Sequence, residues 1–111
     1  MGTAPDIEIY KLKAGLCKSL SDPKRLMIIN ELRHGEKQVG DLVKILQIPQ
    51  AIVSRHLAVL RHGGVVSSRR QGTRIYYGLN DLRIAEACDL VHEILIKQLA
   101  KNRELAERLV T

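Results

Sequence analysis

The chain has 111 residues, of which 18 are Lys or Arg and 12 are Asp or Glu, so its formal net charge is +6. Hydrophobic residues make up 45% of it, which excludes a disordered basic tail and predicts one small folded domain over residues 1–111. No apolar run approaches the ~18 residues of a membrane span, and the N-terminus lacks a secretory pattern. We therefore expect a cytoplasmic protein with no membrane partner.

Two helices are predicted at the start of the chain. Over residues 6–20 the apolar side chains recur at helical spacing. Asp22 can then cap a second helix that has Pro23 in its first turn. We expect this second helix to end near Gly35, where glycine can adopt the left-handed conformation that closes many helices.

Residues 38–62 predict two further short helices joined by a tight turn at residues 47–49. In the second of these helices Val53, Leu57 and Leu60 make one buried face. Two amphipathic helices joined by a three-residue turn form a helix-turn-helix.

A β-hairpin and a long helix are predicted to complete the fold. Residues 65–79 are rich in strand-forming side chains on both sides of a turn at residues 71–73. Asn80 and Asp81 can cap a final helix over residues 81–109, which would be roughly 42 Å long at 1.5 Å per residue.

One face of this final helix follows alternating steps of four and three residues. A helix of ~42 Å would overhang so small a domain, so we expect this face to pack against a second copy of the chain. Packing on the first helix of the same chain is the alternative. The positions concerned are Ile84, Cys88, Val91, Leu95, Gln98, Asn102, Leu105 and Leu109.

The whole net charge lies in residues 42–80. This window holds six cations and no Asp or Glu, whereas the rest of the chain has 18 − 6 = 12 cations against 12 acids. A stretch of one sign predicts a polyanion-binding surface, although a solvated face without a partner would look the same. The cations are Lys44, Arg55, Arg61, Arg69, Arg70 and Arg74.

Duplex DNA is the polyanion that this pattern favours. Arg55 lies between the small residues Ala51 and Ala58 on the face opposite Val53, which would let the helix approach a groove closely. The cations at the hairpin tip suit phosphate or minor-groove contact. Single strands are disfavoured, because a stacking platform needs more exposed aromatic rings than this chain has.

The sequence resembles the winged-helix ArsR/SmtB repressors over nearly its whole length. The resemblance is carried by Leu-Ser-Asp-Pro-Lys-Arg-Leu at residues 20–26, Val-Ser-Arg-His-Leu-Ala-Val-Leu at 53–60 and Arg-Arg-Gln-Gly-Thr-Arg-Ile-Tyr-Tyr at 69–77. It implies a mostly helical winged helix-turn-helix with a small β-hairpin, in the order α-α-α-α-β-β-α. It also implies a homodimer built through the first and last helices, which represses transcription on an inverted-repeat operator until an effector releases it.

The resemblance also implies which residues contact DNA, in the second helix of the helix-turn-helix and in the hairpin, or wing. One departure from the family is Pro49, where a Ser or Thr cap is usual. The implied DNA-binding positions are Gln50, Ala51, Ser54, Arg55, His56, Arg69, Arg70, Gln71, Thr73 and Arg74.

No cofactor is assigned with certainty. The family's Cys-x-Cys metal motif is absent from residues 39–43, and Asp89 and His92 are wrongly spaced for its other metal site. Cys17 and Cys88 remain. They predict either a soft metal or metalloid site completed by His92, or reversible cysteine oxidation, or simply two thiols that line a dimer interface.

Two other function classes stay open. The same helix-turn-helix could bind a protein in place of DNA, or the chain could be a DNA-binding regulator without an effector. An enzyme is not expected, because neither cysteine is accompanied by a glycine-rich loop or a pair of acids.

Overall fold

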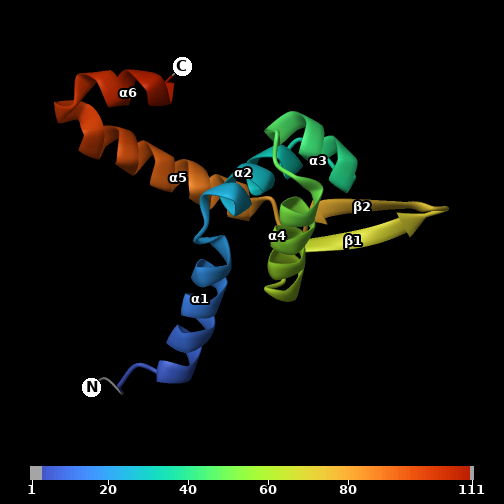
Figure 1. Cartoon of the computed structure of the whole chain (residues 1–111). Helices are drawn as coiled ribbons and strands as arrows, with labels where there is room; N and C mark the ends of the chain where they lie inside the picture. The colour runs from blue at the N-terminus through green and yellow to red at the C-terminus, as the bar shows by residue number, and fades with distance from the viewer. Residues whose placement is uncertain (1–3, 111) are drawn as a thin grey trace. The chain divides into compact units, whose positions relative to one another are not determined.

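A computed structural model of the chain describes residues 4–110, except the side chains of Lys101, Leu105 and Ala106 (Figure 1). The chain divides into two compact units, one ending at Asp81 and the other beginning at Leu82. None of the described helices is both long enough and apolar enough to cross a membrane.

Four helices and a two-stranded antiparallel hairpin make up the first unit, as the sequence predicts. The helix-turn-helix is formed by α3 and α4, and the strands follow directly after it (Figure 1). The elements are α1 (Ile7–Leu20), α2 (Pro23–Leu32), α3 (Val39–Leu46), α4 (Gln50–His62), β1 (Val66–Gln71) and β2 (Arg74–Leu79).

The N-terminal ends of α1 and α2 are capped by aspartates. The carboxylate of Asp6 accepts a hydrogen bond from the backbone N–H of Glu8 at 3.0 Å. Asp22 Oδ1 accepts from the N–H of Lys24 at 2.8 Å and from that of Arg25 at 3.3 Å, and Pro23 follows in the first turn. These bonds satisfy helix N–H groups that otherwise lack a partner, and α2 begins where the cap at Asp22 predicts.

The core of the first unit lies where α2, α3 and α4 meet. The predicted buried face of α4 is confirmed, since Val53, Leu57 and Leu60 are at most 1% exposed. Burial of such side chains stabilises each by roughly 1.5–3 kcal/mol relative to an exposed position. The other buried apolar residues of this unit are Ile28, Ile29, Leu32, Leu42, Ile48, Val65 and Val66.

The turn between α3 and α4 has two unusual backbone features. Gln47 adopts the left-handed conformation, with φ 57° and ψ 41°, and its side-chain amide donates to Lys44 O at 2.9 Å. Pro49 stands at the cap position of α4, where its carbonyl accepts from the N–H of Ile52 and of Val53. Among the residues that the structure describes, no side chain caps α4, so the missing Ser or Thr is not replaced.

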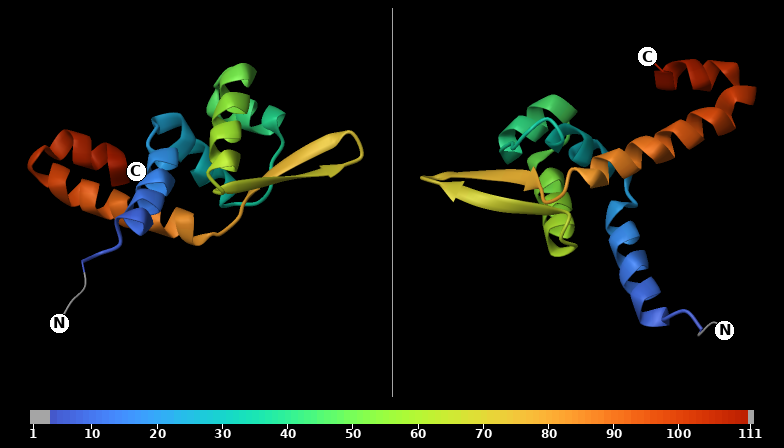
Figure 2. Two further views of the ribbon diagram at one scale, coloured as in Figure 1. Left: turned by 90° about the horizontal axis from the view of Figure 1, so that it is seen from below. Right: turned by 180° about the vertical axis from the view of Figure 1, so that it is seen from behind.

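The hairpin projects away from the helices of the first unit (Figure 2). Its turn contains Gly72 at φ +64°, a conformation that glycine adopts without strain. At its base Val66 is buried, and Tyr77 exchanges two backbone hydrogen bonds with Lys37, of 3.0 and 2.8 Å. The base is therefore held on both strands, while the outer half of the hairpin reaches into solvent.

The prediction of one helix over residues 81–109 is wrong. The second unit contains α5 (Arg83–Gln98), a 3₁₀ turn η1 (Leu99–Lys101) and α6 (Arg103–Val110). The break lies at Asn102, whose φ of −106° and ψ of 88° are not helical and whose N–H donates to Leu99 O at 2.8 Å. Asparagine directly before a helix is a favoured arrangement, because its side chain competes with the backbone for hydrogen bonds.

The cap position of α5 lies later in the chain than the predicted Asn80 and Asp81. Leu82 occupies the cap position of α5 and makes no side-chain cap bond. Asn80 instead donates from Nδ2 to Gly64 O at 2.8 Å, and its own N–H donates to Val65 O at 3.0 Å. Asn80 thus ties the end of β2 to the segment that enters β1.

Candidate nucleic-acid interface

The exposed face of α4 carries four of the predicted DNA-binding side chains. Gln50, Ala51, Ser54 and Arg55 are all exposed, on the side opposite the buried face. This division follows from the helical period of 3.6 residues, which separates the two faces by about half a turn. Since the positive end of the helix dipole is at Gln50, the exposed face favours a negatively charged partner.

The hairpin divides its predicted contacts between two faces. Residues directly opposite on antiparallel strands share a face, and successive residues alternate between faces. Arg69 faces Tyr76 and Gln71 faces Arg74, so these side chains lie on one side. Arg70, which pairs with Ile75, lies on the other side.

Arg69 is held by contacts within the protein. Its Nε lies 2.8 and 2.9 Å from the two carboxylate oxygens of Glu36, and its Nη1 donates to Gln71 Oε1 at 2.9 Å. The guanidinium also lies over the ring of Tyr76, 4.7 Å from its centroid. The hairpin is thereby connected to the segment between α2 and α3, and the charge of Arg69 is largely offset by Glu36.

Arg61 is held in a similar way, because its Nη1 donates to Ser68 Oγ at 3.3 Å and so links α4 to β1. Within the part of the chain that the structure describes, no such contact is made by Arg55, Arg70 or Arg74. These three cations are therefore available to a ligand.

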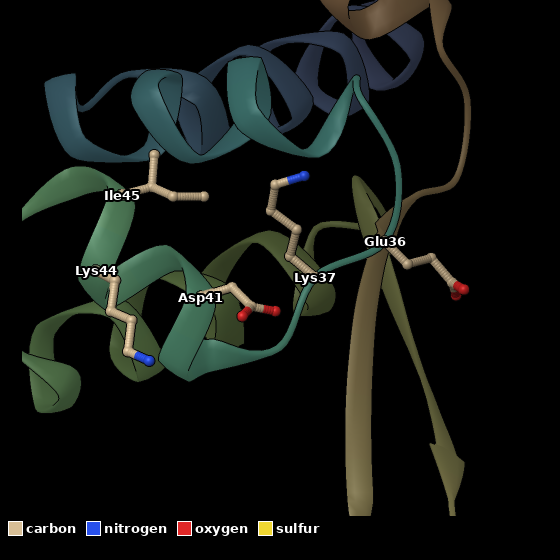
Figure 3. A pocket seen from close by; sticks show the side chains of 5 residues that line it. All are labelled: Glu36, Lys37, Asp41, Lys44 and Ile45. Carbon is tan, nitrogen blue, oxygen red and sulfur yellow. The ribbon is translucent and has the colours of Figure 1, made fainter.

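A hollow of about 300 Å³ lies beside the hairpin base, lined by Glu36, Lys37, Asp41, Lys44 and Ile45 (Figure 3). Glu36 points away from the α3 side chains in Figure 3. The carboxylate of Asp41 accepts from the N–H of Gln38 at 3.0 Å as part of the cap of α3. Both acids are thus engaged by other partners, and the two lysines that line the hollow balance them in formal charge.

His56 does not share the exposed face with the other predicted DNA contacts of α4, because this side chain is buried with only 7% of its surface exposed. Its Nδ1 lies 3.3 Å from Arg25 Nη1 and its Nε2 lies 3.7 Å from Asp22 Oδ1. His56 follows Val53 by three residues, which is nearly one helical turn, so it belongs to the buried side. Burial is the main cause that lowers the pKa of His56, and nearby cations lower it further against the opposing effect of Asp22.

Comparison with known proteins identifies the chain. The sequence model of "bacterial regulatory protein, arsR family" matches residues 22–68, from the cap of α2 into β1. The transcriptional repressor PagR of Bacillus anthracis is 39% identical over 82 residues, which are 73% of this chain and 82% of that relative. The chain belongs to the arsR family.

Other related proteins are similar over most of the chain. The transcriptional repressor SmtB of Mycobacterium tuberculosis is 37% identical over 81 residues, which are 73% of this chain but only 60% of SmtB. A homodimeric winged helix-turn-helix DNA-binding domain from Mycobacterium bovis matches 86% of this chain and 90% of its own, with TM-score 0.73 and 29% identity. The prediction of a winged helix-turn-helix fold in this family is confirmed, and PagR and SmtB are transcriptional repressors.

The cysteines of this arsR-family chain lie in different units. Cys17 is exposed on α1, whereas Cys88 is half-buried on α5 and His92 is exposed on the same helix. Among the described residues, no group of three or more His, Cys, Asp or Glu side chains is placed to hold a metal ion. Sensing at Cys17, Cys88 and His92 stays a prediction.

Proposed function

We propose that the chain is a homodimeric repressor that binds duplex DNA through the exposed face of α4 and through the hairpin. The observation that carries this proposal is that Arg55 on α4 and Arg70 and Arg74 on the hairpin make no ion pair or side-chain hydrogen bond with the described part of the chain. They lie in a window without any acid and next to a helix face that is otherwise small or polar.

The two elements would divide the work of recognition. Ala51 and Ser54 leave room for α4 to enter the major groove, where the guanidinium of Arg55 can donate two hydrogen bonds to a guanine edge. Arg70 and Arg74 would neutralise phosphates, and Gln71 and Thr73 at the hairpin tip can donate to the backbone or to the minor groove.

Exposed apolar side chains support the homodimer. On α1 they are Ile7, Ile9, Tyr10, Leu12 and Leu16, and on α5 they are Leu90, Val91, Ile94 and Leu95. Water-exposed apolar surface of this kind favours docking of another protein surface. The relative from Mycobacterium bovis is a homodimer, so a second copy of this chain is the proposed partner. Two α4 helices about 34 Å apart would then read an inverted repeat.

DNA binding is tested by titrating duplex DNA at several salt concentrations. We expect a steep fall in affinity with salt, because each phosphate contact releases counterions. Arg55→Ala and Arg70→Ala should weaken binding, whereas Arg33→Ala removes the same charge from the end of α2 and should not. If neither α4 nor hairpin variant loses affinity, the proposed face is wrong. An affinity for duplex DNA that is weak and insensitive to salt would favour the protein-interaction module.

The dimer is tested by sedimentation at micromolar concentration. Leu12→Glu and Val91→Glu place a charge in the exposed apolar surfaces of α1 and α5 and should yield monomers. Ile45→Glu makes the same kind of change at an exposed apolar position of α3 and should leave the dimer intact. A wild-type monomer would rule out the proposed assembly.

We also propose that an effector acts at the thiols. DNA binding of the reduced protein would be measured with arsenite, a soft divalent metal or polysulfide present, and compared with that of Cys17→Ser and Cys88→Ser. A response in the wild type that either serine variant lacks supports sensing. A wild type that responds to none of these agents would instead be a regulator without a thiol effector.

A further inference from the structure

A chain of polar contacts crosses the first unit from the end of α1 to α4. Arg25, on α2, is at its centre. Its Nε donates to Ser19 O at 2.7 Å and its Nη2 donates to Lys18 O at 3.4 Å, both at the C-terminal end of α1. On the other side its Nη1 reaches His56 Nδ1 at 3.3 Å.

The contacts of His56 define its hydrogen-bonding state. A guanidinium can only donate, so Nδ1 of His56 must accept from Arg25. The ring proton is then on Nε2, which faces Asp22 Oδ1 at 3.7 Å. The same carboxylate oxygen caps α2 by accepting from the N–H groups of Lys24 and Arg25. Both nitrogens of the buried ring therefore face partners that α2 holds in place.

These contacts differ in kind from the rest of the α4 interface. Leu57 and Leu60 are buried among apolar side chains, and apolar contacts are not directional. Apolar contacts therefore allow a helix to rotate slightly about its axis with little loss of packing energy. Hydrogen bonds depend steeply on angle and distance, so the contact between Arg25 and His56 resists such a turn.

Arg55 moves with His56, because the two are consecutive residues of one helix. A turn of α4 that carried Arg55 away from a base edge would also break the contacts of His56. We propose that His56 is a positioning residue for DNA recognition, which fixes the rotation of α4 through Arg25 and Asp22 so that Ser54 and Arg55 face the groove. This inference rests on the proposed function, since it needs α4 to be the helix that reads DNA.

The test compares a specific duplex with a non-specific one. The specific probe is the duplex that the wild-type protein enriches from a random-sequence library, and the non-specific probe is its shuffled sequence. For His56→Leu we expect about tenfold weaker binding to the specific duplex, which corresponds to the loss of roughly one base contact. The affinity for the shuffled duplex should change by less than about twofold. A merely structural role would weaken both equally.

Two further variants complete the test. His56→Gln keeps an acceptor for Arg25 and a donor toward Asp22, so it should recover most of the specificity. His34→Leu removes an exposed histidine at the end of α2 and should bind both duplexes as the wild type does. If His56→Leu does not fold, Arg25→Lys decides, because lysine keeps the charge but lacks the planar fork that reaches Ser19 O and His56 Nδ1 together. Arg25→Lys should lose specificity without losing affinity for the shuffled duplex.

The outcomes separate this inference from the proposed function. If Arg55→Ala leaves specificity unchanged, α4 is not the reading helix and the proposed DNA face fails. If Arg55→Ala abolishes specificity while a folded His56→Leu, or Arg25→Lys in its place, keeps it, only the positioning role is overturned. An equal loss on both duplexes for the deciding variant overturns the positioning role as well.

Discussion

The two parts of the proposed DNA face, α4 and the hairpin, are held in different ways. Leu57 and Leu60 bury α4 in the core, and the buried His56 adds directional contacts to α2. The hairpin is buried only at its base and is restrained further out by the pair of Arg69 with Glu36, both of which are exposed. We infer that the orientation of α4 depends on packing, whereas that of the hairpin depends on an ion pair that salt and mutation can weaken.

The largest difference is expected in stability. Leu57→Ala removes a side chain that is 1% exposed and should lower the free energy of unfolding by about 2–5 kcal/mol. Ile75→Ala removes a side chain that is 40% exposed on β2 and should cost less than about 1 kcal/mol. Urea denaturation of both variants measures the two changes in the free energy of unfolding. Comparable losses would show that the hairpin is as firmly packed as α4.

The next difference concerns specificity. Arg55→Ala should lose about 1–3 kcal/mol of discrimination between the enriched and the shuffled duplex, because a base contact is removed. Arg70→Ala should weaken both duplexes alike and lower the salt slope by about one, as expected for a phosphate contact. Anisotropy titrations at several salt concentrations distinguish the two. The division of roles is contradicted if the two variants behave identically.

A smaller effect is expected from the ion pair. Glu36→Gln removes the charge that offsets Arg69, so binding to duplex DNA should become tighter at low salt and its salt slope should rise by up to about one. Stability should change by less than about 1 kcal/mol, since the pair is exposed. Glu31→Gln, elsewhere on the first unit, is the control for the change in net charge. An unchanged slope in Glu36→Gln would mean that Arg69 stays away from DNA even when unpaired.

The smallest effect is expected from acidification. The pKa of His56 is lowered, mainly by burial, so the unfolded chain binds the proton more readily than the folded one does. The neutral ring therefore makes its full contribution to the free energy of unfolding above the ordinary pKa of 6.5. This contribution is lost as the pH falls from 6.5 toward the lower pKa of the folded state. Urea denaturation between pH 7.5 and 5.5 should show a steeper decline for the wild type than for His56→Gln. Parallel curves of the free energy of unfolding against pH would exclude His56 as the source of the decline.

Local features of the fold were predictable because their signals lie within a few residues. Asp22 and Pro23 mark the start of α2, and Val53 and Leu57 mark the buried face of α4 at helical spacing. The break at Asn102 could not be predicted from the spacing of the apolar residues. The four-and-three spacing continues through that position, so periodicity contains no sign that the backbone leaves the helix there.

The sequence alone determined where the cations stand along the chain, where most helices begin, and which face of α4 is exposed. Only the tertiary structure decided which of those charges have partners within the protein. Glu36 reaches Arg69 from 33 residues upstream, and Arg25 reaches His56 across 31. Contacts between residues so far apart leave no periodic pattern, because they depend on how the helices and the hairpin pack and not on the order of neighbouring residues.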